Sequence, residues 1–360
     1  MKKIIYLIVF IIIVPFAISA VGVLESEETE DTEEAFIIED LSGSRVEFDT
    51  VPQRITFVGK ASNIVADALY MFPEAGSRVV GVGNTNQRNG DFVEILDPEY
   101  SEKTYLAHSA GPEQIAVTRP DLVILKNFHK PKLGASVSQL GIPVLYLNLE
   151  TPEAYEEDLR MLGQVFNNPE RAEELVQYYK QEMDYVVQRT QSVSDKPKIL
   201  FLYHSTRDGI AAFNIPPESW IQTRMITMSG GTPVWTDANP GNGWSKVHLE
   251  QIAAWNPDQI YVVAYKEDIG TVLESMKNST EWQELKAVKN GQLKAFPVDF
   301  YSWDQPDSRW ILGLKWLAKQ VHPDLFADLD LEQMARSFYR DLYNLSDQQF
   351  DDEIGSRLGW

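Results

Sequence analysis

The chain has 360 residues, of which 44% are hydrophobic and 24% are charged, which is typical of a globular protein with two domains or one large one. It contains no cysteine, so disulfides, thiolate metal sites and a cysteine nucleophile are excluded. The formal charge of −21 argues against a general affinity for nucleic acid or anionic membranes, because phosphate groups are bound by basic surfaces.

The N-terminus has the pattern of an export signal. Lys2 and Lys3 precede residues 4–24, which carry no charge, and residues 17–20 supply the small side chains of a cleavage site. At about 1.5 Å per residue, this run is also long enough to cross a bilayer as a helix. We therefore expect residues 1–24 to be a signal peptide or a retained membrane anchor. The rest of the chain is then extracytoplasmic, in the periplasm or on the outer cell surface.

An acidic linker is predicted over residues 25–35, because a run of like charges repels itself and extends. The first 40 residues hold nine acids and two bases, which leaves 44 acids against 30 bases in the body of the chain. The lysines are expected to stay inside the cell while the acidic stretch leads out. About a third of the net negative charge therefore belongs to this N-terminal segment.

Residues 36–150 are predicted to form a first α/β lobe. Apolar runs at residues 54–59, 78–83, 121–125 and 143–147 are typical of strands. Ser62 and Asn63 are expected to cap a helix that continues through Leu69. Runs of β-branched residues and leucine, separated by helices, predict strands that are buried on both faces and hence a mostly parallel sheet.

A helical bridge over residues 151–192 is expected to follow, with helices at 153–166 and 169–191. The second of these helices would be roughly 35 Å long, enough to span one domain and reach another. Residues 193–360 are predicted to form a second α/β lobe. Its strands are expected at 198–203, 259–263 and 293–298, and its helices at 309–321 and 331–344. The predicted fold class is α/β, with two lobes of mostly parallel sheet joined by a long helix.

An internal repeat supports two related lobes. Residues 113–124 and 250–261 share the pattern E-Q-I-A-x-x-x-P-D at the same spacing, each followed by a predicted strand. A short helix, a proline turn and the start of a strand account for most of this pattern. They do not account for Glu113 and Glu250, which open the two copies.

Signatures of catalysis are scarce. The five histidines show no paired metal-ligand spacing, and the sequence contains no G-x-S-x-G elbow, P-loop or complete G-x-G-x-x-G. We therefore predict a protein that is not an enzyme and has no metal site or cofactor. The enzyme-class alternative is a metal-dependent hydrolase or chelatase that uses the histidines and the carboxylates of a cleft.

Bases and aromatic residues follow the predicted strand ends, which is where open α/β sheets bind ligands. In this acidic protein they predict a pocket for a large anionic or aromatic-contacting ligand. The candidate ligand-binding residues are Lys60, Asn84, Arg88, Lys126, Tyr203, Arg207, Trp220, Arg224, Trp244, Trp303 and Arg309. His129, Lys130, His204 and Tyr301 lie at similar positions.

Lys60 also precedes a predicted helix N-terminus, whose free N–H groups favour anions. Asp307 and Ser308 are expected to cap the helix that begins near Arg309. Trp310, Leu314 and Leu317 share one face of that helix and are predicted to lie in the core.

Over residues 36–345 the order of these elements resembles the substrate-binding proteins of ABC importers for iron–siderophore, haem or cobalamin. The resemblance rests on Arg54-Ile55-Thr56, Gly81-Val82-Gly83, Glu113 with Pro120-Asp121, Gly141-Ile142-Pro143, the long helix, Glu250 with Pro257-Asp258, and His322-Pro323. It implies a rigid helix between the lobes, a ligand held in the cleft between them, and only small closure.

The resemblance also implies that one glutamate in each lobe meets arginines on a membrane permease, and Glu113 and Glu250 occupy those positions. Exposed opposite charges of this kind steer docking and fix its register. The sequence lacks the lipid-modified cysteine of many relatives, and an uncleaved anchor can substitute for it.

We therefore expect a monomeric binding protein that delivers a metal chelate to an ABC permease and its cytoplasmic ATPase. The alternative ligand is a small oxyanion such as molybdate or tungstate, held by backbone N–H groups and a few bases. A further alternative is a surface sensor or adhesion module that uses the same lobes without a permease.

Overall fold

The computed structural model describes residues 36–84, 87–207 and 210–358. The predicted signal or anchor at residues 1–24 and the acidic linker to residue 35 lie outside these ranges. Within them, no helix is both long and apolar enough to cross a membrane. The chain from Ala35 onward forms one compact unit.

The first lobe is built on a five-stranded parallel sheet in the order β5-β4-β3-β6-β7. Each strand that the sequence predicts is present, and β5 is an additional one that the apolar pattern did not reveal. The strands are β3 (Ile55–Phe57), β4 (Val79–Gly83), β5 (Thr104–Leu106), β6 (Leu122–Lys126) and β7 (Val144–Leu147). All five residues of the interior strand β6 are buried, as expected for a sheet covered on both faces.

Short helices connect these strands: α1 (Ser62–Leu69), α2 (Ala75–Arg78), α3 (Val93–Leu96), α4 (Pro112–Ala116) and α5 (Ala135–Gln139). A two-stranded hairpin of β1 (Phe36–Glu39) and β2 (Arg45–Phe48) precedes the sheet.

The second lobe contains a mixed sheet in the order β11-β9-β8-β12-β13, with β10 also paired to β8. Strands β10, β12 and β13 run parallel to β8, whereas β9 is antiparallel to β8 and to β11. The strands are β8 (Lys198–Arg207), β9 (Ile210–Ile215), β10 (Thr232–Pro233), β11 (Ser245–Val247), β12 (Gln259–Val263) and β13 (Leu293–Ala295). The predicted α/β class with two lobes is confirmed, but the mostly parallel sheet holds only in part for this lobe.

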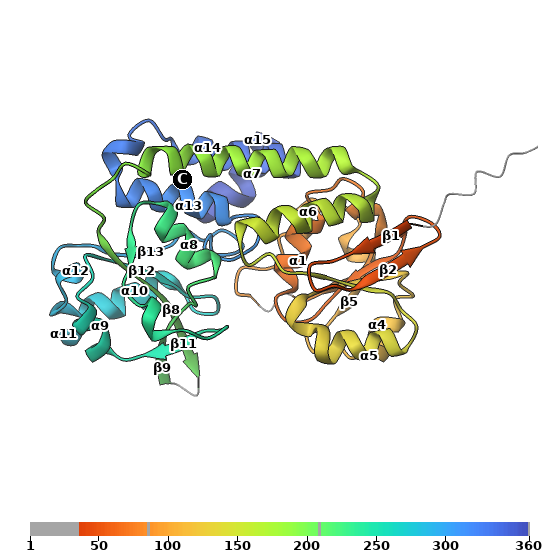
Figure 1. Ribbon diagram of the computed structural model, residues 1–360, viewed down its shortest axis with the longest axis horizontal. Coiled ribbons are helices and arrows are strands. Elements are labelled where there is room, and N and C mark those ends of the chain that lie inside the picture. Colours follow the sequence, from red (N-terminus) through yellow and green to blue (C-terminus); the bar gives the residue numbers. More distant parts are fainter. Residues whose placement is uncertain (1–35, 85–86, 208–209, 359–360) are drawn as a thin grey trace, which may run out of the picture. The chain divides into compact units, whose positions relative to one another are not determined.

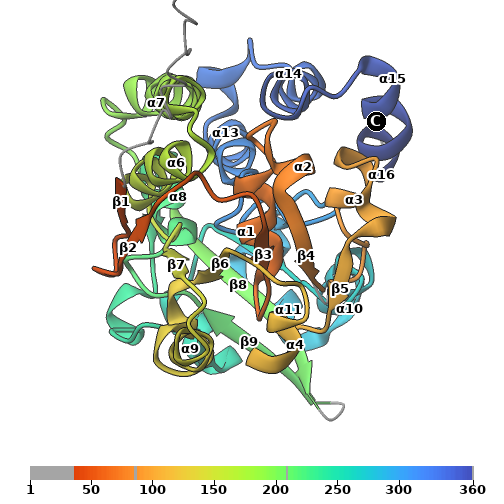
Figure 2. The same cartoon turned by 90° about the vertical axis from the view of Figure 1, so that its right-hand side faces the viewer.

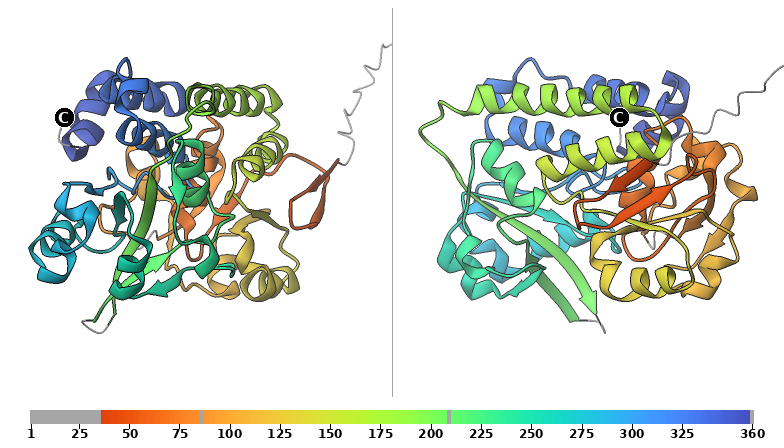
Figure 3. Two further views of the ribbon diagram at one scale, coloured as in Figure 1. Left: turned by 60° about the vertical axis from the view of Figure 1, so that its left-hand side comes forward. Right: turned by 45° about the vertical axis from the view of Figure 1, so that its right-hand side comes forward.

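The antiparallel part arises from the hairpin of β8 and β9, which the sequence analysis missed. Figure 3 shows these two green strands running toward the side of the molecule opposite the long green helix. Asp208-Gly209 between them is a dipeptide that favours tight hairpin turns, and it was the available signal. The hairpin extends β8 four residues beyond its predicted end at residue 203.

Helices α6 (Pro152–Phe166) and α7 (Pro169–Thr190) form the predicted bridge. Side-chain oxygens of Thr151 and Asn168 cap their first turns. Figure 1 shows α7 running along one side of the molecule past both sheets. It packs against α6 and against α13 (Trp310–Val321) of the second lobe, so one continuous helix contacts elements of both halves of the body.

The remaining helices belong to the second half of the chain. They are α8 (Ile221–Met228), α9 (Leu249–Trp255), α10 (Ile269–Asn278), α11 (Thr280–Gln283), α12 (Lys286–Lys289), α14 (Leu331–Tyr343), α15 (Asp347–Gln349) and α16 (Ser356–Leu358).

The predicted cap of α1 is wrong. Ala61, in the left-handed region at φ 64°, is the N-cap residue and makes no side-chain cap. Ser62 instead donates from its hydroxyl to the carbonyl oxygens of Gly83 and Asn84, at 3.3 and 3.1 Å. This contact ties the start of α1 to the end of β4, because both lie at the same edge of the sheet.

The internal repeat has a structural basis in its Pro-Asp pair. The carboxylate of Asp121 accepts hydrogen bonds from the backbone N–H groups of Gln53 and Arg54, at 2.8 and 2.9 Å, just before β3. Asp258 accepts one from Lys198, the first residue of β8, at 2.8 Å. Each aspartate therefore fixes the start of the first strand of its own sheet.

Arg309 lies in the core and not in a ligand site, contrary to the sequence expectation. Its side chain is 0% exposed and forms ion pairs with Asp67 of α1, with Asp299 at 2.7 Å and, more distantly, with Asp307 at 4.0 Å. We call these four residues the interlobe ion cluster. Asp67 belongs to the first lobe and the other three follow β13, so the cluster fastens one lobe to the other.

Aromatic side chains enclose this cluster. The Arg309 guanidinium lies 4.3 Å from the ring centroid of Phe92 and 5.0 Å from that of Tyr301. Trp303 is also buried and donates from its indole nitrogen to Asp299 at 2.9 Å, so this residue too departs from the ligand contact expected of it. Burial lowers the pKa of Arg309, but the carboxylates outweigh that effect and hold it above its ordinary value.

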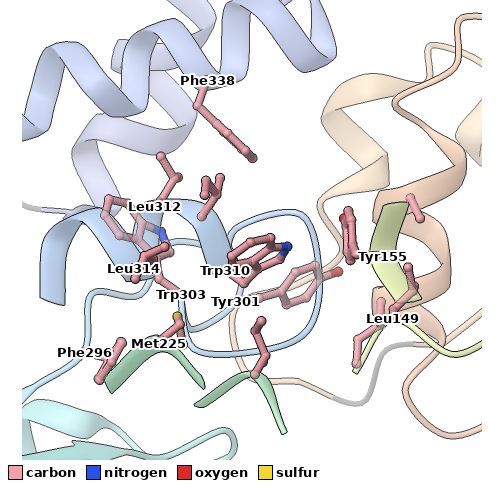
Figure 4. Close-up of a cluster of buried hydrophobic side chains, with 14 of the residues drawn as sticks. Leu149, Tyr155, Met225, Phe296, Tyr301, Trp303, Trp310, Leu312, Leu314 and Phe338 are labelled. Atoms are coloured by element: carbon pink, nitrogen blue, oxygen red, sulfur yellow. The ribbon is translucent and has the colours of Figure 1, made fainter. Parts of the chain in front are cut away.

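The start of α13 is packed in the core and held by hydrogen bonds. Trp310, Leu314 and Leu317 are in the core, as predicted. Asp307 accepts a hydrogen bond from the backbone N–H of Arg309 at 2.8 Å, and the hydroxyl of Ser308 instead hydrogen-bonds with that of Tyr343 at 2.6 Å. Figure 4 shows Trp310 and Tyr301 between the α13 side chains and Tyr155 of α6.

The C-terminal helix α14 reinforces the same junction. Tyr339 donates to Asp299, and Tyr343 donates to the backbone carbonyl of Asp67 at 3.0 Å. Arg357, which follows further along the chain, donates to the carbonyl of Asn89 in the first lobe at 3.2 Å. The C-terminal residues therefore contact both lobes, whereas the sequence analysis assigned them to the second lobe.

Replacing Arg309→Met is expected to lower the free energy of unfolding by about 3–5 kcal/mol, because it leaves three carboxylates buried without their cation. Arg224→Met is the matched control, since Arg224 forms an exposed pair with Glu153 at 3.1 Å and should cost less than about 1 kcal/mol. Urea unfolding measures both values. Equal costs for the two variants would contradict the structural role of the cluster.

Stability should also depend on pH through Asp67. Burial, partly offset by Arg309, raises the pKa of Asp67 to about 7. Because the folded protein then retains a proton that the unfolded chain releases, this contribution to stability falls as pH rises from about 4 to about 7. Asp67→Asn removes the titration, so we expect the variant to cost less at pH 8 than at pH 4.5 in urea unfolding. A cost that is the same at both pH values, or larger at pH 8, would contradict this.

Candidate functional site

Four aromatic side chains from four separate segments pack together at the C-terminal end of the second sheet. We call them the aromatic wall: Tyr203 on β8, Trp220 before α8, Trp244 before β11, and Tyr265 after β12. Tyr203 stacks on Tyr265 with ring centroids 4.6 Å apart and contacts Trp244 at 5.0 Å, and Trp220 meets Trp244 edge-on at 5.4 Å. Each ring is only partly buried.

Three of these four residues were predicted ligand contacts, and the structure brings them together. Tyr265 is the one that sequence reasoning missed. The available signal was its position directly after the predicted strand at 259–263, the same argument that selected Tyr203.

A set of polar side chains joins this wall to the first lobe. The hydroxyl of Tyr265 donates to Asp304 at 2.7 Å, and the amide of Gln222 donates to the same carboxylate at 3.4 Å. The neighbouring Gln305 accepts hydrogen bonds from Asn63 at 3.3 Å and Gln87 at 2.7 Å, both from the first lobe. We call these residues the polar floor. Burial raises the pKa of Asp304 to about 6.

On the first lobe, the turn from Gly59 to Asn63 offers backbone donors. Gly59 and Ala61 have φ angles of +102° and 64°, and the turn leads directly into the eight-residue helix α1. In the described part of the chain, the backbone N–H groups of residues 60–63 have no hydrogen-bond acceptor. Such a helix start favours an anion, as the sequence predicted for Lys60, whose side chain is exposed.

His129 lies against this turn. Its Nε2 atom is 3.2 Å from the carbonyl oxygen of Lys60, and burial lowers the pKa of the imidazole. The ring therefore supports the turn, whereas the predicted Lys130 donates to the carbonyl of Ser42 at 2.7 Å, in the loop between β1 and β2.

Two arginines that the sequence predicted to bind the ligand form ion pairs with acidic residues. Arg88 lies 2.9 Å from Asp268 of the second lobe, and Arg224 lies 3.1 Å from Glu153 at the start of α6. Both pairs are about half exposed. The side chain of Arg207 lies outside the described part of the chain.

Lys126 and Asn84 have mainly structural contacts. Lys126 is buried and pairs with Glu150 at 2.7 Å, so the expected ligand contact is replaced by an internal ion pair. Asn84 donates from its backbone to Leu106 at 2.8 Å and accepts from Ser62. These contacts hold the loop that follows β4 against its neighbours.

Glu113 and Glu250 occupy equivalent positions in the two lobes. Glu113 lies in the first turn of α4 and Glu250 in the first turn of α9, and both are exposed. Neither forms an ion pair with any residue that the structure describes. Figures 1 and 2 both show α4 and α9 on the side of the molecule away from α7, so one partner surface can face both helices.

A catalytic centre is not evident in the described ranges. Among those residues, no three histidines or acids come close enough to hold a metal ion. The polar groups that converge do so on the lobe junction, through the hydrogen bonds of Asp304 and Gln305.

A family model described as "Periplasmic binding protein" matches residues 54–299. The molybdate-binding protein MolA of Haemophilus influenzae is 24% identical over 297 residues, which is 76% of this chain and 82% of MolA. The vitamin B12-binding protein of Salmonella typhi is 25% identical over 58% of this chain and 72% of its own length.

Solved structures agree with the fold. A periplasmic solute-binding protein of Veillonella parvula has a TM-score of 0.70 at 25% identity, covering 90% of this chain and 97% of that one. CeuE of Helicobacter pylori, in a complex with Ni-His, has a TM-score of 0.71 at 18% identity, covering 89% and 99%. The resemblance drawn from the sequence is confirmed, and the chain belongs to the periplasmic binding protein family.

Proposed function

We propose that this protein is the extracytoplasmic binding component of an ABC importer, and that it captures an anionic metal chelate at the lobe junction. The observation that carries the proposal is the aromatic wall. The protein delivers the chelate to a permease and performs no chemical step on it. The export signal or anchor at residues 1–24 and a monomeric state remain part of this proposal.

The aromatic wall is evidence for a ligand that has a broad unsaturated surface. Four large rings from separate segments are left partly exposed, although burying an aromatic side chain is favourable. A flat ligand placed against Trp220, Trp244 and the two tyrosines would complete that burial and gain stacking. The vitamin B12-binding relative from Salmonella typhi is in keeping with such a chelate.

Features of the first lobe support the proposal that the ligand is negatively charged. The exposed Lys60 and the N–H groups of residues 60–63, which have no acceptor among the described residues, are positive features in a body that has 44 acids against 30 bases. An anion that reaches this turn is stabilised by several donors at once.

A small oxyanion is the second candidate, and two observations favour it. The backbone N–H groups of residues 60–63 suit a tetrahedral anion, and MolA, a molybdate-binding protein, is matched over 82% of its length. An oxyanion held there would not need the aromatic wall. The two candidates therefore predict different effects of removing one ring from it.

We also propose that Glu113 and Glu250 meet arginines of the permease, one from each lobe. Their exposure, their lack of ion pairs in the described ranges and their equivalent places on α4 and α9 support this role. The charges would orient the loaded protein on its transporter.

Ligand binding should require Trp244. Trp244→Ala removes the ring that contacts both Tyr203 and Trp220, and we expect affinity to fall at least about tenfold, or ~1.4 kcal/mol. Ferric siderophores, haem, cobalamin and molybdate are titrated by tryptophan fluorescence quenching. Trp255→Ala is the matched control, because Trp255 is a half-buried residue at the end of α9, outside the wall.

A chelate that binds wild type and the Trp255 variant but not the Trp244 variant supports the leading proposal. Molybdate binding that is unchanged in both variants would favour the oxyanion candidate instead. If no chelate quenches the wild-type protein, the chelate proposal is wrong.

Docking is tested separately by reversing both charges. Glu113→Lys combined with Glu250→Lys should reduce uptake into cells at least about tenfold while ligand binding stays unchanged. Glu157→Lys combined with Glu170→Lys, on α6 and α7, is the control with the same change in net charge. Unimpaired uptake with the first pair would rule out this docking surface and favour a sensor or adhesion role.

A further inference from the structure

A cavity of about 720 Å³ lies between the β8–β9 hairpin and helix α10. Successive residues of a strand point to opposite faces of the sheet. Tyr203 faces the aromatic wall, whereas His204, the next residue of β8, packs edge-on against Phe213 of β9 at 5.5 Å and lines the cavity. The cavity is therefore on the other side of β8 from the proposed chelate site.

The floor of this cavity is apolar and aromatic. Phe213 meets Trp282 of α11 with ring centroids 4.8 Å apart, and Val272 and Met276 of α10 complete the surface. Trp282, Val272 and Met276 are buried, so the floor is firmly packed against the lobe. It suits the hydrocarbon part of a ligand.

Two buried polar atoms at this cavity have no hydrogen-bond partner in the ranges that the structure describes. They are Nδ1 of His204 and Oε2 of Glu267. The other carboxylate oxygen of Glu267 accepts a hydrogen bond from the backbone N–H of Thr206 at 2.8 Å, which fixes the carboxylate in place. A buried polar atom without a partner is costly, so a ligand that supplies donors here is favoured.

Both atoms can accept a hydrogen bond. Glu267 is an acceptor when ionised, and a neutral imidazole protonated on Nε2 presents Nδ1 as an acceptor. Burial lowers the pKa of His204, in keeping with the neutral form. A hydroxyl group has one hydrogen to donate, whereas a primary ammonium has three and can donate to more than one acceptor.

We propose that this cavity is a second binding site, which takes an organic cation with an apolar body and a primary ammonium group. The ammonium donates to Glu267 and His204 and lies beside the faces of Phe213 and Trp282, which attract cations. The body of the ligand covers Val272 and Met276. This site goes beyond the proposed function, because it differs from the chelate site in position and in the charge of its ligand.

The other charged groups at the cavity are consistent with a cation. Arg88 is neutralised by Asp268 at 2.9 Å, and Asp268 uses its second oxygen to cap α10 through Thr271 at 2.8 Å. Lys266 is exposed, so solvent screens its charge. Among the residues that the structure describes, Glu267 therefore has no ion-pair partner, and its Oε2 atom is buried. Since Arg88 belongs to the first lobe, the rim of the cavity is completed across the lobe junction.

The test measures binding of three probes of one shape by isothermal titration calorimetry of the protein from Ala35 onward, which forms the compact unit. The probes are 2-phenylethylamine, which is a cation, 2-phenylethanol, which is neutral, and phenylacetate, which is an anion. We expect the amine to bind at least tenfold more tightly than either of the others. Equal binding of the three probes, tighter binding of phenylacetate, or no binding of the amine would overturn the proposal.

Two variants locate the site. Glu267→Gln keeps an oxygen for the N–H of Thr206 but removes the charge, and it should weaken amine binding at least tenfold. Ser275→Trp fills the cavity from an exposed position on α10, where the change is compatible with folding, and it should abolish binding. Trp244→Ala should leave amine binding unchanged. Amine binding that survives both cavity variants, or is lost with Trp244→Ala, would place the amine elsewhere and overturn the assignment.

Discussion

The arrangement of this molecule depends on one buried cation. Arg309 pairs with Asp67 of the first lobe and with Asp299 of the second, and it has no exposed surface. Desolvating a guanidinium and three carboxylates is costly, and only close pairing and enclosure by Phe92, Tyr301 and their neighbours offset that cost. The loop between Asp299 and Arg309 is therefore fixed at the lobe junction. That loop carries Asp304 and Gln305, which form the polar floor, and Asp304 in turn holds Tyr265 in the aromatic wall.

The fold was predictable from the sequence where a signal is local. Runs such as Leu122–Lys126 are strands because their residues suit a sheet buried on both faces, and the bridge helices begin at Thr151 and Asn168 because those side chains cap them. The repeated Pro-Asp pair proved to mark the start of the first strand in each lobe. The β8–β9 hairpin was missed because the Asp-Gly turn signal between its two strands was not used.

The site was predictable only in part, because position after a strand end does not reveal what a side chain meets. That rule found Tyr203, Trp220 and Trp244, which do lie together. It also selected Arg309 and Lys126, whose partners cannot be seen locally: Asp67 is 242 residues from Arg309 in the sequence. A basic residue in an aromatic-rich loop has the same appearance whether its carboxylate partner is a ligand or a distant part of the same chain. For Arg309, the partners are the carboxylates of Asp67 and Asp299 in the same chain.

Native mass spectrometry of the protein isolated from its source tests whether the aromatic wall holds a metal chelate at the lobe junction. We expect one adduct per protein molecule, with the isotope pattern of a metal and an organic mass. The adduct is absent from the Trp244→Ala variant and present in Trp255→Ala. A bound metal oxyanion with no organic part, or the same organic adduct retained by the Trp244 variant, would contradict the account.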